Sequence, residues 1–163
     1  MKIMVPLDGS ELAESVLPCV EDLARRLSAE VHFVQVVSLD ASLLVAASAG
    51  RSYTARLLAL ELRAEAEKAT ARPSSLAAEW TSRGIDARWE VVRGDPARCI
   101  IACASRCGAD LIAMSTHGRS GVARLLLGSV AERVVRDAQL PVLLFGPTVA
   151  SVSARSVASH AVA

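Results

Sequence analysis

Glycines and small polar residues gather in two segments whose pattern suits the binding of a phosphate group. One is Pro6-Leu7-Asp8-Gly9-Ser10, and the other is Ser115-Thr116-His117-Gly118-Arg119-Ser120-Gly121, which is followed by Gly128-Ser129. Glycines let backbone amides approach a ligand closely, and a helix start offers unpaired amides with a partial positive charge. Arg119 adds a full positive charge. The pattern therefore predicts an anion site suited to phosphates.

Asp8 and Ser129 also have simpler structural interpretations. Asp8-Gly9-Ser10 has the form of a turn that leads into a helix N-cap, and Ser129 with Glu132 has the form of a capping box. An aspartate can equally accept hydrogen bonds from the amino or hydroxyl groups of a ligand. Capping by Ser129 is compatible with phosphate binding because both use the same helix start, so both interpretations stay open at this point.

Three cysteines raise the question of a metal or redox cluster. Cys99, Cys103 and Cys107 are spaced by four residues, which places them on one face of a helix. Their neighbourhood has no Cys-x-x-Cys pair and no histidine at a spacing typical of zinc sites. Free cysteine behaves as a small buried hydrophobe, so we expect these three, and Cys19 on an earlier helix, to serve packing.

Short apolar runs alternate with longer helical patterns, which is typical of a parallel sheet covered by helices. In an open sheet of this kind, ligands bind outside the carboxyl ends of the strands, where both polar segments lie. The run at 85–91 alternates between apolar and polar residues, which predicts a strand with one wet face at a sheet edge. The strands are expected at 3–5, 31–37, 85–91, 111–114 and 141–145.

Helical spacing of apolar residues and turn residues predict four helices between these strands. The first begins after Ser10 and runs to about 27, with a bend at Pro18 but no division into two elements. The second covers 53–82, is interrupted near Pro73 and is closed by a glycine at 84. The third starts with Asp95 as N-cap and proline at its first position, and ends near 108. The fourth covers 129–138.

Composition restricts the class of protein. The chain has 163 residues, of which 52% are hydrophobic and 3% aromatic, and its net charge is +1. Disordered chains combine low hydrophobicity with high net charge, and nucleic-acid-binding domains need a basic surface, so neither class fits.

The apolar runs are shorter than the roughly 18 to 20 residues of a membrane span, and the first residues do not resemble a signal peptide. We expect a cytoplasmic protein without membrane contact, made of one domain over 1–146 and a disordered tail over 147–163.

The two polar segments and several other landmarks resemble the UspA-type universal stress protein family. Its nucleotide-binding members carry Gly-x-x-Gly, nine further residues, and then Gly followed by Ser or Thr. Here Ser115 stands at the first glycine, while Gly118 and Gly128-Ser129 match. The opening Ile-Met-Val-Pro-Leu-Asp-Gly-Ser and the Gly-Asp-Pro turn at 94–96 also match, as do Ala-Asp-Leu at 109–111 and Pro-Val-Leu-Leu at 141–144. The resemblance implies a three-layer α/β sandwich with a five-stranded parallel sheet of order 3-2-1-4-5, which is a Rossmann-like fold of the adenine nucleotide alpha hydrolase-like type.

The resemblance also implies a nucleotide site. Asp8 and Val36 would contact the adenine and ribose end of ATP, and Met114, Ser115 and Gly118 would line the sugar and phosphate loop. Gly128, Ser129 and Val130 would hold the phosphates. The expected nucleotide-binding residues are Pro6, Leu7, Asp8, Val36, Met114, Ser115, Gly118, Arg119, Gly128, Ser129 and Val130. The β-carbon of Ser115 either narrows the approach to the ribose or demands strained backbone angles, so we expect weakened or unaltered binding rather than its loss.

The leading functional hypothesis is an ATP-binding regulatory protein of the stress response, with ATP bound with or without Mg²⁺, acting as a homodimer. The resemblance places the strand Val142–Phe145 at a sheet edge, and this continuously apolar strand invites pairing with a second copy.

The alternative is a dimeric interaction module of the same fold that binds no nucleotide, which Ser115 favours. An ATP hydrolase ranks last, because no Walker motif, metal-carboxylate pair or positioned general base accompanies the phosphate loop. We therefore expect no enzyme.

Overall fold

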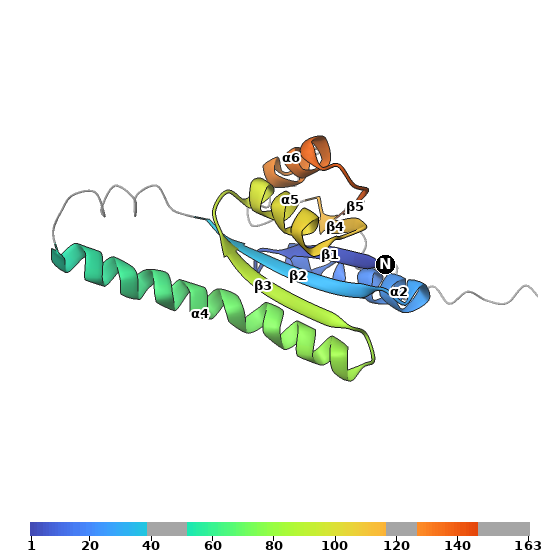
Figure 1. Ribbon diagram of the computed structural model, residues 1–163, viewed down its shortest axis with the longest axis horizontal. Coiled ribbons are helices and arrows are strands. Elements are labelled where there is room, and N and C mark those ends of the chain that lie inside the picture. The colour runs from blue at the N-terminus through green and yellow to red at the C-terminus, as the bar shows by residue number, and fades with distance from the viewer. Residues whose placement is uncertain (39–51, 117–126, 147–163) are drawn as a thin grey trace, which may run out of the picture.

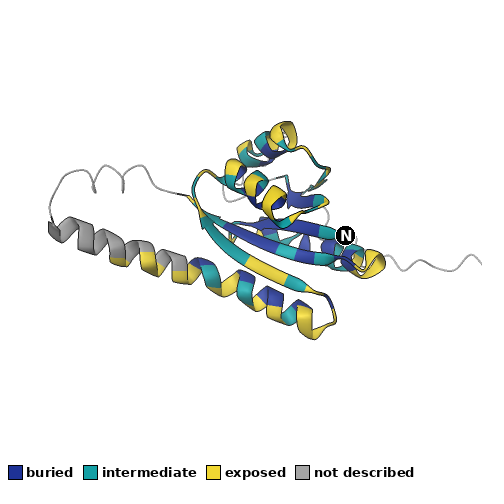
Figure 2. Cartoon of the chain, viewed as in Figure 1, coloured by how far each residue is buried: buried dark blue, intermediate teal, exposed yellow. Residues whose placement is uncertain are grey.

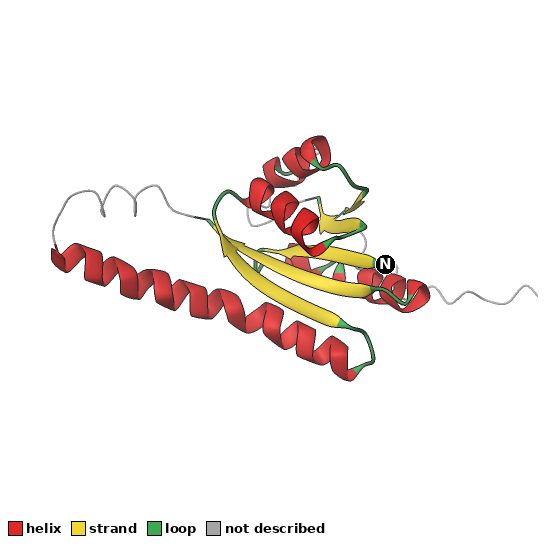
Figure 3. Ribbon diagram, in the orientation of Figure 1, coloured by secondary structure: helices red, strands yellow, loops and turns green. Residues whose placement is uncertain are grey.

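A computed structural model describes residues 1–38, 52–116 and 127–146 of the chain. The strands are β1 (Lys2–Leu7), β2 (Glu30–Val37), β3 (Ala87–Arg93), β4 (Leu111–Ser115) and β5 (Val142–Phe145). The helices are α1 (Glu11–Glu14), α2 (Leu17–Leu27), α4 (Ser52–Ser82), α5 (Pro96–Cys107) and α6 (Ser129–Asp137). Helices and strands alternate along the chain, as the sequence predicts (Figure 3).

The strands form one sheet of order β3-β2-β1-β4-β5, and each neighbouring pair is parallel. The predicted fold class is therefore confirmed. β1 lies in the middle of the sheet and is buried from Ile3 to Leu7, as expected for a strand covered on both faces. β3 and β5 are the edges, and Trp89 on β3 is 39% exposed. Figure 2 shows the buried residues concentrated along β1 and β2.

Helices cover both faces of the sheet, so the domain has three layers (Figure 1). One core packs α2 and α4 against the sheet around Phe33, whose ring meets Trp80 edge to face with centroids 5.1 Å apart. The other core packs α5 and α6 around Met4, Val34 and Ile112. The connection that leaves β1 runs over the first face and the connection that leaves β4 runs over the second, so the neighbouring strands β1 and β4 define the point where the connections diverge.

Three local predictions are wrong. The helix expected after Ser10 consists of two helices, because Pro18 lies in the first turn of α2, where its missing N–H costs no helical hydrogen bond. α4 continues through Pro73 without an interruption, and this proline is fully buried in the core beside it. α6 has Gly128 as its N-cap and no side-chain cap, so Ser129 is its first helical residue and forms no capping box with Glu132.

The start of α5 agrees with the prediction. Asp95 is its N-cap and accepts a hydrogen bond from the Arg98 amide at 3.0 Å, with Pro96 at the first position. The helix ends at Gly108, which has φ of 67°. The expected tail over 147–163 lies outside the described residues.

The cysteines form no disulfide in the structure. All four cysteines are free, and Cys103 is buried in the α5 core. Within the described ranges, no cluster of three or more histidine, cysteine or acidic side chains could hold a metal ion. The described helices include none that is both long and apolar enough to cross a membrane.

Candidate functional site

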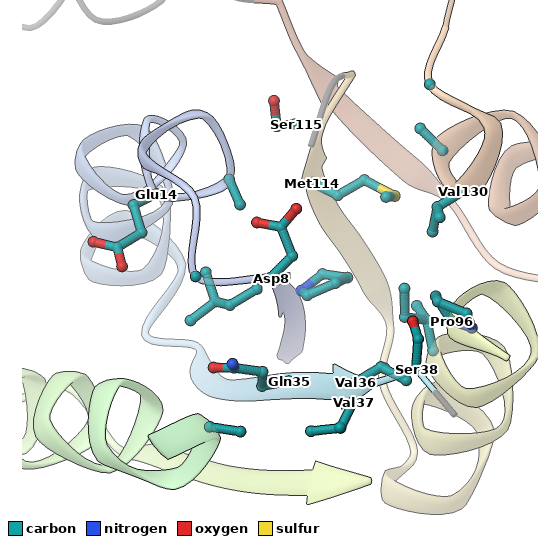
Figure 4. Close-up of a pocket in the computed structure, with 18 of the residues that line it drawn as sticks. Asp8, Glu14, Gln35, Val36, Val37, Ser38, Pro96, Met114, Ser115 and Val130 are labelled. Carbon is teal, nitrogen blue, oxygen red and sulfur yellow. The ribbon is translucent and has the colours of Figure 1, made fainter. Parts of the chain in front are cut away.

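A cavity of about 1030 Å³ lies at the carboxyl ends of β1, β2 and β4, where the connections diverge. This volume is at the upper end of the roughly 300–1,000 Å³ typical of ligand pockets. Nine of the eleven predicted site residues line the cavity, and Figure 4 shows several of them converging from separate elements. They are Pro6, Leu7, Asp8, Val36, Met114, Ser115, Gly128, Ser129 and Val130. Gly118 and Arg119 lie outside the described residues.

The first turn of α6 forms one wall of the cavity. The Gly128 amide donates to the Thr116 carbonyl at 2.8 Å, which fixes the helix start against the end of β4. The amides of Ser129, Val130 and Ala131 follow in the first turn, where a helix provides no acceptors for them. Because the N-cap residue Gly128 has no side chain to cap this helix, the partial positive charge of the helix start faces the cavity. This wall can hold an anion.

Asp8 takes part in a turn and also lines the cavity, so its structural role is confirmed and its role in ligand binding stays a prediction. Its Oδ1 accepts hydrogen bonds from the Ser10 amide at 2.9 Å and the Ser10 hydroxyl at 2.6 Å. Ser10 Oγ in turn accepts from the Ala13 amide at 3.1 Å, so Ser10 is the N-cap of α1. Gly9 makes the turn with φ of 77°. The carboxylate also lines the cavity, near its centre in Figure 4. The turn therefore holds Asp8 in place for a ligand.

The α5 and α6 side of the cavity is apolar. Met114 and Ile100 belong to the core on this face, and Val36 and Val130 pack against it. Such a surface suits a flat apolar group such as a nucleobase.

An ion pair connects the two helices that carry this apolar wall. Arg133 on α6 donates two hydrogen bonds to the Asp95 carboxylate, at 2.8 and 2.9 Å. These bonds hold the pKa of Asp95 below its usual range. Pro96, which lines the cavity, follows Asp95 in the chain. Val130, which also lines the cavity, lies on the same helix as Arg133. Sequence reasoning did not single out Arg133, because the contact joins residues 38 positions apart.

The opposite side of the cavity is polar. Glu14 on α1, Gln35 on β2 and Lys68 and Arg72 on α4 line it. Arg72 binds both carboxylate oxygens of Glu14, with Nε to Oε1 at 2.8 Å, and this contact raises the pKa of Arg72. Sequence reasoning missed all four residues. The available signal was Gln35, an uncharged polar residue inside the apolar run of β2.

Ser115 is the last residue of β4 and pairs with Phe145 of β5. It is 7% exposed. Among the non-glycine residues that the structure describes, only Ser28 has a positive φ. The expectation that Ser115 could demand strained backbone angles is therefore wrong, because strand geometry accommodates any side chain. Its β-carbon does lie at the cavity wall.

Residues 1–146 match the model of the universal stress protein family. The chain belongs to the universal stress protein family. A curated relative, the universal stress protein MJ0531 of Methanocaldococcus jannaschii, is 37% identical over 143 residues, which are 88% of this chain and 80% of the relative. Among solved structures, the MJ0577 protein of the same organism superimposes with a TM-score of 0.76 at 27% identity, covering 89% of this chain and 94% of that one.

A universal stress protein from Archaeoglobus fulgidus, solved in complex with dAMP, shares the fold. Its TM-score is 0.58 at 20% identity, and the match covers 88% of this chain and 96% of that one. These comparisons agree with the parallel α/β fold described above.

Proposed function

We propose that this universal stress protein binds ATP in the cavity at the carboxyl ends of β1, β2 and β4, and acts as a nucleotide-dependent regulatory protein of the stress response. The observation that carries the proposal is the convergence of nine predicted residues from β1, β2, β4 and α6 on one cavity. In the sequence these residues are up to 124 positions apart, from Pro6 to Val130, so no local effect brings them together.

The chemistry of each wall matches one part of the nucleotide. The apolar side with Val36 and Met114 takes the adenine ring, and Asp8 accepts a hydrogen bond from a ribose hydroxyl. The phosphates meet the amides of Ser129 and Val130 at the start of α6, together with the Ser129 hydroxyl. The dAMP complex of the Archaeoglobus fulgidus relative supports an adenine nucleotide as the ligand class.

Mg²⁺ enters this proposal only as the ion that accompanies the phosphates of ATP. The cavity-lining carboxylates in the described residues are Asp8 and Glu14, and each already accepts hydrogen bonds, from Ser10 and Arg72 respectively. In this proposal Asp8 serves the ribose and Glu14 pairs with Arg72, so neither carboxylate is assigned as a general base for hydrolysis, and the protein is proposed to bind ATP rather than to cleave it.

The proposed working unit is a homodimer formed through β5. This strand is an edge of the sheet, and its Leu143 is 38% exposed. An apolar edge strand with unpaired backbone groups is a favourable surface for a second copy.

The experiment for ATP binding is calorimetric titration of the wild-type protein, of Gly128→Val and of a control, Gly146→Val. Gly128 is the N-cap of α6 and lines the cavity, so we expect a valine side chain there to obstruct the approach of the phosphates. A β-carbon at Gly146 has nothing within 4 Å, and Gly146 does not line the cavity. We expect binding by the wild type and the control, and loss of binding by Gly128→Val with an unchanged circular dichroism spectrum.

Absence of binding at millimolar ATP by a folded wild-type protein would contradict the proposal. It would favour the alternative, a dimeric interaction module of the same fold. Mass spectrometry of small molecules released on denaturing the freshly purified protein distinguishes a cavity that is already filled from one that does not bind nucleotide.

A further inference from the structure

The cavity extends beyond the apolar side and the start of α6 that are described above. It continues to the face of the sheet that α1 and α4 cover, where its lining changes from apolar to polar (Figure 4). We call this part the α4 compartment and define it by Glu14, Gln35, Lys68, Ala69 and Arg72. None of these residues belongs to the glycine motif, so the compartment is a separate feature of the cavity.

Gln35 is the least expected residue in the α4 compartment. Side chains alternate along β2, so Gln35 shares a face with Val31 and Phe33, both completely buried in the apolar core. Gln35 itself is 7% exposed, and its Oε1 has no hydrogen-bond partner among the described residues. A buried acceptor without a partner destabilises a fold. An apolar residue would pack better here, which indicates that the amide serves a ligand.

Lys68 supplies a positive charge to the α4 compartment. It is exposed and four residues from Arg72, so both lie on the same face of α4, and the buried Ala69 also lines the cavity. Lys68 takes part in none of the ion pairs between described residues.

Glu14 is the negative charge of the compartment, and Arg72 compensates it. Arg72 Nε and Nη2 donate to the two different oxygens of the Glu14 carboxylate. Guanidinium and carboxylate then form a neutral pair, while Arg72 keeps further N–H donors that this contact does not use. The other two charges of the cavity lining are the Asp8 carboxylate, which lies near Gln35 in Figure 4 and accepts hydrogen bonds from Ser10, and the exposed Lys68 ammonium.

We propose that the α4 compartment is an anion-binding site, in which Lys68, Gln35 and Arg72 hold a phosphate or carboxylate group of a small molecule. Lys68 provides the charge, the Gln35 amide donates a hydrogen bond once its side chain adopts the appropriate orientation, and Arg72 adds a further donor. The site goes beyond the proposed ATP binding and does not depend on it, because it uses other residues on the other face of the sheet.

The lysine content of the chain makes a direct test possible. Lys2 and Lys68 are its two lysines. Acetylation of the native protein by a brief pulse of acetic anhydride, read by peptide mass spectrometry, reports both amines in one sample. Lys2 serves as the internal reference because it starts β1, whose other end meets the cavity, and it is absent from the cavity lining; its Nζ donates to the Cys107 carbonyl at 2.8 Å. The probes are inorganic phosphate and succinate, compared with sodium chloride at equal ionic strength.

We expect phosphate or succinate to lower the acetylation of Lys68 by about tenfold at about ten times its Kd, since acetylation follows the unoccupied fraction. Acetylation of Lys2 should not change. Protection by phosphate alone identifies a phosphate site, and protection by succinate a carboxylate site. Protection should disappear in Gln35→Met and Arg72→Gln and persist in Arg63→Gln, an exposed cation of the same helix outside the cavity lining.

Protection should also persist in Gly128→Val, which separates this site from the proposed nucleotide site. If ATP binds and neither probe protects Lys68, the α4 compartment proposal is overturned and the nucleotide proposal stands. Equal protection of Lys2 and Lys68, or protection that survives both Gln35→Met and Arg72→Gln, would also overturn it. Protection of Lys68 without ATP binding supports the compartment and contradicts the nucleotide proposal.

Discussion

Replacing Gln35 by methionine should stabilise the protein. Methionine has nearly the same length and volume as glutamine but no polar group, and its thioether adapts to irregular apolar surroundings. The neighbours of Gln35 on the same face of β2 are Val31 and Phe33, both 0% exposed. The substitution therefore removes a buried acceptor that lacks a partner among the described residues and leaves the packing largely intact.

The size of the effect follows from the state of that acceptor. A buried polar group without a hydrogen bond costs about 1–3 kcal/mol of stability. For a chain of this size, each 1 kcal/mol moves the midpoint of thermal unfolding by roughly 2–4 °C. Gln35→Met should therefore raise Tm by roughly 2–12 °C in a buffer free of phosphate and carboxylates.

The assay is thermal unfolding of matched variants followed by circular dichroism, with urea unfolding to obtain the free energy. The control is Gln139→Met, at an exposed position, which should change the free energy of unfolding by less than about 0.5 kcal/mol. A Tm for Gln35→Met equal to or below that of the wild type would refute the reasoning, because it would mean that the amide is already satisfied in the folded protein.

Four further predictions follow from the same structure. Ser129→Ala should weaken ATP binding roughly ten- to a hundredfold in calorimetry, the range for a hydrogen bond to a charged group; an unchanged Kd would remove the hydroxyl from the site. Arg133→Ala should weaken ATP binding severalfold while the fold persists, because it releases the start of α5 at Asp95 from α6; equal affinity would show that this ion pair does not position the wall. Leu143→Glu should convert a dimer into a monomer in light scattering, and a wild-type protein that is monomeric at micromolar concentration would contradict the interface. Burial raises the pKa of the Cys103 thiol to about 11, so iodoacetamide should modify Cys103 slowly at pH 8 and faster as the pH approaches that value; rapid modification at pH 8 of the folded protein would contradict this burial.

The strands could be predicted from sequence because their signals are local, whereas the order of the strands in the sheet came from the resemblance to the family. Apolar runs bounded by turn residues mark β1, β2 and β4, and the alternation of polar and apolar residues marks the edge strand β3. Asp95 followed by proline identifies the start of α5 for a chemical reason that needs no tertiary context. The Asp95 carboxylate accepts from a free amide of the first turn, and the proline has no N–H that would need a partner there.

The errors in the helices have a common cause. Pro18 was expected to bend a helix, but the chain ends α1 and begins α2 just before it. Pro73 was expected to interrupt α4, but its burial together with that of Leu76, Ala77 and Trp80 stabilises the continuous helix. In both cases tertiary packing decides how the chain accommodates a proline, and sequence patterns do not contain that information.

The candidate site was predictable only on the side of the glycine motif. The residues of the α4 compartment come from α1, β2 and α4, and each has an ordinary local explanation as a surface charge or a strand residue. Their convergence requires the packing of α4 on the sheet, so Lys68 and Arg72 could not be placed beside Gln35 beforehand. Gly118 and Arg119, which the sequence nominates for the phosphate loop, lie outside the described residues and stay predictions.

The most direct test of nucleotide binding in the cavity is a ¹⁵N-edited NMR titration of the full-length protein with ATP. We expect the largest amide shift changes at Val36, Met114, Ser129 and Val130, which line the cavity from three elements, and no shift changes for amides of α2, which is absent from the cavity lining. Saturable changes confined to other surfaces, or no changes at millimolar ATP, would contradict it.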